Sequence, residues 1–178
     1  EADETIDALS MEKAVETWGN AKPYMSRDSV RIYAPDLVIA YGNDVDSAAL
    51  VVMSMFTDED NGSVTDTTDE GHGPGNVHKA HLYKDYMDKA KNKVSFEFKE
   101  LDDPMKFRYT LILFNWLFSP DNPYKYGSND KRIMAWNVGY SGLKDPKRKK
   151  RREDYLKKFK IYMRCHRELR DMGYAHFF

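Results

Sequence analysis

The chain has 178 residues, a length that suits a single domain, and 41% of them are hydrophobic, which is enough to bury a core and excludes a wholly disordered chain. It contains no run of 18 apolar residues, so we expect no transmembrane segment and a soluble protein. Its one cysteine, Cys165, excludes an internal disulfide and a cysteine-rich metal site, which fits a reducing compartment or a fold that needs no disulfide.

The first residue is Glu1 rather than Met, from which we expect a processed N-terminus, and the compartment itself is left open. The formal net charge is −1, but acidic and basic residues are separated along the chain. Residues 1–76 contain 16 Asp and Glu against 4 Lys and Arg, a net charge of −12, whereas residues 144–178 contain 5 against 13, a net charge of +8. These segments either lie against each other within one fold or face partners of opposite charge.

The first third of the chain predicts one helix and several short strands. Apolar residues recur at helical spacing over residues 3–18. Residues 30–32 alternate with polar neighbours, and residues 37–41 are a short apolar run, so both segments are predicted strands. The apolar segment 48–56 is ambiguous between a buried strand and a helix, and its two adjacent valines favour a strand slightly.

The middle of the chain predicts a long acidic loop followed by a helix. Residues 57–76 are rich in Asp, Thr and Gly and have little to bury. A loop of this length is uncommon and usually functional, so its order would indicate a neighbouring subunit that holds it in place, with crystal packing as the alternative. The predicted helix runs over residues 76–91, and Asn76 is a suitable N-cap.

The hydrophobic period then changes from that of a helix to that of a strand. Residues 94–98 and 105–113 both alternate between apolar and polar side chains, with Asp-Asp-Pro between them, and this pattern predicts a β-hairpin. Residues 134–140 predict a third strand. The expected fold class is therefore α+β: a single domain of residues 1–178 with an antiparallel sheet of three to five strands, an N-terminal helix, a middle helix and a long basic C-terminal helix.

The last predicted helix spans residues 146–172, begins at Asp145-Pro146, and would be about 40 Å long. Its first turns hold an unbroken run of cations: Lys147, Arg148, Lys149, Lys150, Arg151 and Arg152. Cations at this end oppose the positive pole of the helix dipole, so helix stability does not explain them. We predict that the run, together with Lys157 and Arg164, binds an anionic partner, either an acidic protein surface or nucleic acid. The alternative is that these cations form a solvated charged face that binds no partner.

Two further features are candidates for sites. The aromatic residues Phe177 and Phe178 either fold back into the core or dock on another chain, and we expect docking. His78, His81 and Asp85 have the spacing of one helical face and are metal-ligand types. They match no recognised zinc-enzyme pattern, so we predict no metal and no cofactor, with these three as the weak candidates.

No catalytic motif identifies a chemistry in this sequence, which has no phosphate-binding loop, no Gly-x-Ser-x-Gly and no dinucleotide fingerprint. No catalytic residue is assigned, and an enzyme is the minority interpretation. We expect a non-enzymatic structural or assembly subunit of a larger complex, such as a virion or an organellar assembly. It would bind other protein subunits through its acidic N-terminal third, its basic helix and its aromatic tail. The alternatives are a nucleic-acid-binding protein that uses the basic helix and, third, a metal-dependent hydrolase.

Overall fold

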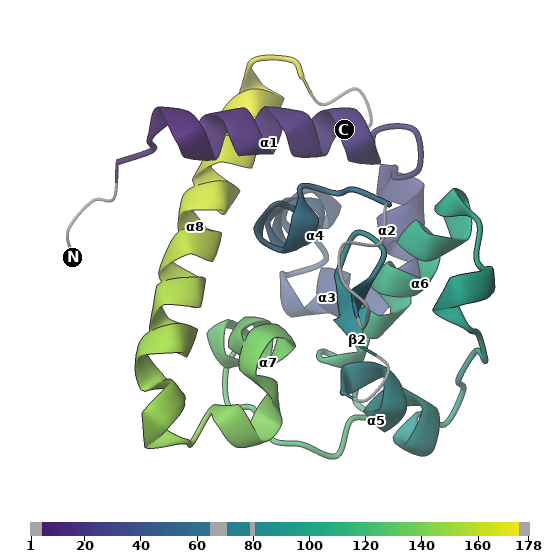
Figure 1. Cartoon of the computed structure of the whole chain (residues 1–178). Coiled ribbons are helices and arrows are strands. Elements are labelled where there is room, and N and C mark those ends of the chain that lie inside the picture. Colours follow the sequence, from purple (N-terminus) through teal and green to yellow (C-terminus); the bar gives the residue numbers. More distant parts are fainter. Residues whose placement is uncertain (1–4, 65–70, 79–80, 175–178) are drawn as a thin grey trace.

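Figure 1 shows the computed structural model, which describes residues 5–64, 71–78 and 81–174. Over these residues the chain forms eight α-helices and one pair of two-residue strands. The helices are α1 (Ala8–Ala21), α2 (Arg27–Tyr33), α3 (Pro35–Ala40), α4 (Val45–Asp60), α5 (Leu82–Lys89), α6 (Asp103–Trp116), α7 (Asn129–Gly142) and α8 (Lys149–Asp171). The antiparallel strands are β1 (Gly71–His72) and β2 (Val77–His78).

Helix α4 occupies the centre of the molecule, where Figure 1 views it nearly end-on. It packs against α1, α2, α3 and α8, and all its residues from Ala48 to Thr57 are buried. The carboxylate of Asp44 begins the helix by accepting hydrogen bonds from the backbone N–H groups of Asp46 and Ser47. The strand predicted over residues 48–56 is therefore wrong. A helix that is surrounded on all sides is apolar on all sides, so its sequence shows no helical period.

The prediction of a strand over residues 105–113 is also wrong, because this segment lies inside α6. Asp102 caps the helix by accepting a hydrogen bond from the Met105 N–H, so the Asp-Asp-Pro sequence is a helix start rather than a turn. The alternating apolar positions coincide with a buried helical stripe at Phe107 and Leu111, which are four residues apart.

Residues 94–98 pair with no strand in the described part of the chain. Glu97 has extended backbone dihedrals, and the flanking Phe96 and Phe98 are buried in an aromatic cluster formed by α5 and α6. Within this cluster the Phe96 ring stacks on Tyr109 with ring centroids 4.3 Å apart. The alternating pattern here reflects burial against helices rather than membership of a sheet.

The other predicted strands are helical as well: residues 30–32 lie in α2, residues 37–41 lie in α3 and its C-cap, and residues 134–140 lie in α7. The short β1–β2 hairpin falls where the sequence predicted a loop. The expected α+β fold with a sheet of three to five strands is thus contradicted by a mostly helical structure with one two-stranded sheet. Short apolar runs cannot distinguish a strand from a buried helix.

Three predicted helices are present with different boundaries. Residues 3–18 correspond to α1, and residues 76–91 to the shorter α5. Residues 146–172 correspond to a 3₁₀ turn at Pro146–Arg148 followed by α8, which ends before Gly173 with φ +87°. Of the predicted loop 57–76, the first four residues belong to α4, and residues 65–70 lie outside the described residues.

Candidate functional site

Helices α7 and α8 run antiparallel and form a helical hairpin along one side of the molecule (Figure 1). The Lys160 ammonium lies 3.1 Å from the Asp130 carboxylate, and the Arg151 Nε donates a hydrogen bond of 3.1 Å to Asn137 Oδ1. Arg152 donates to the backbone carbonyls of Gly142 and Asp145, at 3.2 and 2.7 Å. Its charge therefore meets the negative end of α7, so this member of the basic run stabilises the hairpin.

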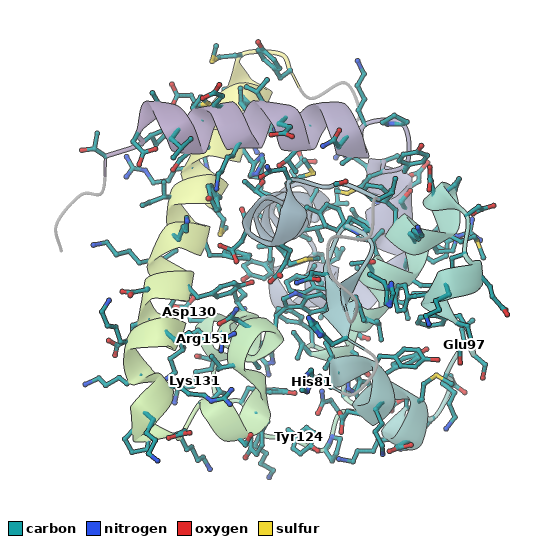
Figure 2. All side chains as sticks on the ribbon, viewed as in Figure 1. His81, Glu97, Tyr124, Asp130, Lys131 and Arg151 are labelled. Atoms are coloured by element: carbon teal, nitrogen blue, oxygen red, sulfur yellow. The ribbon has the colours of Figure 1, made fainter. Side chains whose placement is uncertain are left out.

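The other five cations of the run, residues 147–151, lie exposed in the 3₁₀ turn at Pro146–Arg148 and at the start of α8, where Figure 2 labels Arg151, and we call them the cationic turn. Arg148 lies 3.8 Å from Asp145, and Lys150, 88% exposed, pairs with Asp154 at 2.5 Å. The side chains of Lys147 and Lys149 have no ion-pair or hydrogen-bond partner among the described residues. Solvent-exposed pairs contribute at most about 1 kcal/mol each, so the fold itself neutralises little of this charge.

The remaining predicted binding residues are less available than the cationic turn. Lys157 is exposed and Arg164 is half-buried, and each already takes part in an interaction within the structure. Phe177 and Phe178 lie outside the described residues, so the docking of the aromatic tail stays a prediction.

The acidic N-terminal third lies partly against α8, which packs on α1 and α4. Hydrogen bonds from Ser10, aided by the charge of Lys158, lower the pKa of Asp7. Burial raises the pKa of Asp58 to about 6, and the charges of Lys158 and Lys13 oppose that rise. The two segments of opposite charge are therefore partly matched within the fold. The cationic turn lies beside α7, at the end of α8 farthest from α1 (Figure 1).

The three weak metal candidates do not form one site. The rings of His78 and His81 lie close, with centroids 5.6 Å apart. The Asp85 carboxylate instead accepts hydrogen bonds of 3.0 Å from Trp116 Nε1 and from the Tyr124 hydroxyl. It also pairs with Lys89 at 2.7 Å. Among the residues that the structure describes, no three His, Cys, Asp or Glu side chains gather in a group that could hold a metal ion.

The structure reveals a pair of carboxyl groups that the sequence analysis assigned to a loop, Asp58 and Glu59 at the end of α4. Burial and the neighbouring Asp58 raise the pKa of Glu59 to about 8, against hydrogen bonds from Asn76 and Trp136. Tyr155 on α8 is buried beside them, and burial together with their charges raises its pKa. The signal in the sequence was that acidic residues directly follow the buried apolar segment. We assign this pair no metal-binding role, because no metal-ligating group joins it in the described part of the chain.

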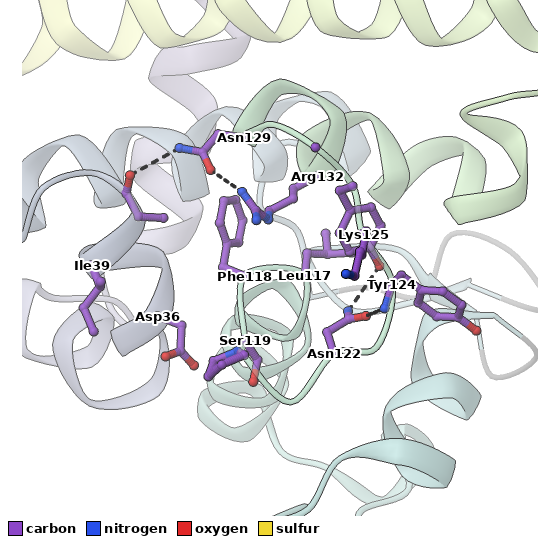
Figure 3. A pocket seen from close by; sticks show the side chains of 14 residues that line it. Asp36, Ile39, Leu117, Phe118, Ser119, Asn122, Tyr124, Lys125, Asn129 and Arg132 are labelled. Atoms are coloured by element: carbon purple, nitrogen blue, oxygen red, sulfur yellow. Dashed lines mark hydrogen bonds between the residues drawn. The ribbon is translucent and has the colours of Figure 1, made fainter.

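An open cleft of about 650 Å³ lies between α3, the end of α6, the following loop and the start of α7 (Figure 3). Its lining includes Asp36, Phe118, Lys125 and Arg132. These residues come from segments far apart in the chain, so no local motif could have identified them.

Comparison with known protein families, with curated proteins and with solved structures found no match. No helix in the described ranges is both long and apolar enough to cross a membrane.

Proposed function

We propose that this protein is a non-enzymatic assembly subunit that binds an acidic surface of a partner protein through the cationic turn, residues 147–151. The observation that carries the proposal is the exposure of five consecutive cations in the 3₁₀ turn and the first residues of α8. Each cation there opposes the helix dipole and repels its neighbours. An anionic partner would relieve both unfavourable terms, and burying the contact in an interface would strengthen the attraction.

Two features favour an acidic protein over nucleic acid. The aromatic residues of α8 near the turn, Tyr155 and Phe159, are buried, so they offer no face on which a base could stack. Carboxylates are also interspersed on the hairpin, where Asp145, Glu153 and Asp154 adjoin the cations. A phosphate backbone carries only negative charge and would be repelled by them, whereas a protein surface can match a mixed pattern.

Nucleic-acid binding is the second candidate, because the hairpin as a whole is strongly basic. Residues 129–160 contain twelve Lys and Arg against four Asp and Glu, a net charge of +8. Backbone binding to phosphates needs only such a charge and falls steeply with added salt. The test below therefore separates the two partners. The metal-dependent hydrolase is not proposed, since its candidate ligands do not meet.

The test uses a carbodiimide, which joins a lysine amine directly to a carboxylate, on the protein isolated with its native partners after nuclease treatment. We expect mass spectrometry to find Lys147, Lys149 or Lys150 linked to Asp or Glu of another protein chain. A link to a second copy of this chain also supports the proposal, with that copy as the acidic partner. If nuclease treatment removes the native partners and no such links are found, the proposal is overturned in favour of nucleic-acid binding.

Charge-reversed variants provide the control. The K147E/K149E/K150E variant should lose partner recovery by about tenfold or more, because attraction becomes repulsion. It should fold like the wild type, since the favourable interaction of acidic side chains with the helix dipole offsets the loss of the exposed Lys150–Asp154 pair. The matched variant K22E/K84E/K91E reverses three exposed lysines elsewhere and should keep the partner. Equal losses in both variants would contradict a role for the cationic turn.

A further inference from the structure

The cleft beside the start of α7 has the size and lining of a small-molecule site. Its volume of about 650 Å³ lies within the usual range of roughly 300–1,000 Å³ for ligand pockets. Leu117, Phe118 and Tyr126 are buried and form an apolar base, while Ile39 on α3 is 63% exposed and forms an apolar wall. An exposed isoleucine beside an aromatic base is the kind of surface that an apolar ligand body covers.

Arg132 lines this cleft beside Asn129 and Phe118 and is held in place there (Figure 3). Its Nη1 donates a hydrogen bond of 2.7 Å to Asn129 Oδ1, and the amide of Asn129 in turn donates to the Ala40 carbonyl at 3.2 Å. The guanidinium also lies over the Phe118 ring, 5.7 Å from its centroid. One side of the group is thus fixed by Asn129 of α7 and by Phe118, which follows the end of α6. The other guanidinium N–H groups have no partner among the described residues.

The charges around Arg132 are distributed unequally in the cleft. Lys125 is exposed on the lining and has no ion-pair partner in the described part of the chain. The carboxylate of Asp36 lines the opposite side in Figure 3, where it accepts a hydrogen bond of 3.0 Å from Asn115. An anionic group would therefore be drawn to Arg132 and Lys125 and repelled from Asp36, which would orient an elongated ligand.

We propose that this cleft binds a small molecule that combines a flat apolar body with one oxyanion group, a carboxylate or a phosphate. Arg132 and Lys125 bind the oxyanion, because a guanidinium with free N–H groups matches two oxygens of one acid group. The apolar body lies between Ile39 and the aromatic base. This site is separate from the cationic turn, so it goes beyond the assembly role and does not depend on it.

The test is a titration of the full chain followed by NMR of its backbone amides, with four probes: adenosine monophosphate, indole-3-acetate, adenosine and inorganic phosphate. Adenosine monophosphate or indole-3-acetate should bind at submillimolar concentration and shift the amide signals of the cleft residues. The probe that binds tells whether the oxyanion is a phosphate or a carboxylate. Adenosine and inorganic phosphate, which each lack one half of the ligand, should bind at least about tenfold more weakly.

Substitutions test whether Arg132 and Lys125 bind the oxyanion of the probe. The variants R132M and K125A should each weaken binding of the active probe by about tenfold. K125A changes an exposed side chain and is expected to fold normally, so it keeps the test valid if R132M is unstable. The control K131A removes a neighbouring exposed cation that does not line the cleft and should bind like the wild type. Absence of binding at millimolar probe, or equal affinity in all variants, would overturn the proposal.

Discussion

The Nε2 atom of His166 lies 2.7 Å from the hydroxyl oxygen of Thr57, inside the protein where α8 meets α4. The Thr57 hydroxyl also lies 2.8 Å from the Met53 carbonyl and 3.0 Å from the Thr17 hydroxyl of α1. Because Thr57 can donate its one hydrogen to Met53, we assign the Nε2–H tautomer to His166, which then donates to Thr57. This network joins the three helices that define the centre of the fold.

His166 should make the protein sensitive to acid. Burial lowers its pKa from 6.5 to about 3, so folding favours the neutral ring. Its contribution to stability is present above the unfolded pKa and is lost as pH falls below 6.5. Between pH 7 and pH 4.5 we expect the wild type to lose about 2.5 kcal/mol of unfolding free energy that H166Q does not lose. Urea unfolding of the wild type and of H166Q at the two pH values measures this loss of unfolding free energy. Parallel pH profiles would contradict the assigned burial of a neutral imidazole.

Glu59 should have the opposite effect at higher pH. Its folded pKa of about 8 lies above the ordinary glutamate value of 4.5, so the folded state prefers the protonated acid. Stability is then present below pH 4.5 and is lost as pH rises through 8. E59Q, which stays neutral, should gain about 4 kcal/mol relative to the wild type between pH 5 and pH 8.5. The measurement is denaturant unfolding at both pH values. If the two proteins differ by the same free energy of unfolding at both, the raised pKa of Glu59 is refuted.

Asn115 of α6 supports the start of α3. Its Oδ1 accepts a hydrogen bond of 3.0 Å from the Leu37 N–H, and its Nδ2 donates to the Asp36 carboxylate. The N-cap residue of α3, Ala34, has no side chain that could do this. N115A should therefore destabilise the fold by about 1–3 kcal/mol. N137A, which removes a hydrogen bond to the exposed Arg151, should cost less than about 0.5 kcal/mol in the same thermal unfolding assay. Equal costs would show that Asn115 is not a structural cap.

Gly75 and Gly19 should respond in opposite ways to alanine. A Cβ atom on Gly75 would lie 2.5 Å from Thr110 Cγ2 and 2.9 Å from Trp136, so the loop before β2 could not stay against α6 and α7. G75A should lose about 1–3 kcal/mol of stability by overpacking. Gly19 lies within α1 with open space around it, so G19A should gain about 0.5–1 kcal/mol. Calorimetry of both variants measures these changes in stability. A G75A variant as stable as the wild type would contradict the close packing of Gly75 against α6 and α7.

Much of α8 could be predicted because its signals are local. Asp145 and Pro146 mark the start of the 3₁₀ turn that leads into it, Gly173 follows its end, and the buried Tyr155, Phe159 and Tyr162 have helical spacing. The cationic turn could be located for the same reason, since its residues are consecutive in the sequence. Its exposure, and the use of Arg152 inside the hairpin, could not be predicted, because both depend on where α7 packs.

The amino-acid sequence alone indicated three helices, α1, α5 and α8, although not their exact bounds, because caps and helical spacing act within a few residues. Only the tertiary structure decided that residues 48–56 and 105–113 are helices, since burial on several sides, not the local pattern, selects their apolar side chains. The cleft likewise exists only after folding, which brings Asp36 and Arg132 to one place from opposite parts of the chain.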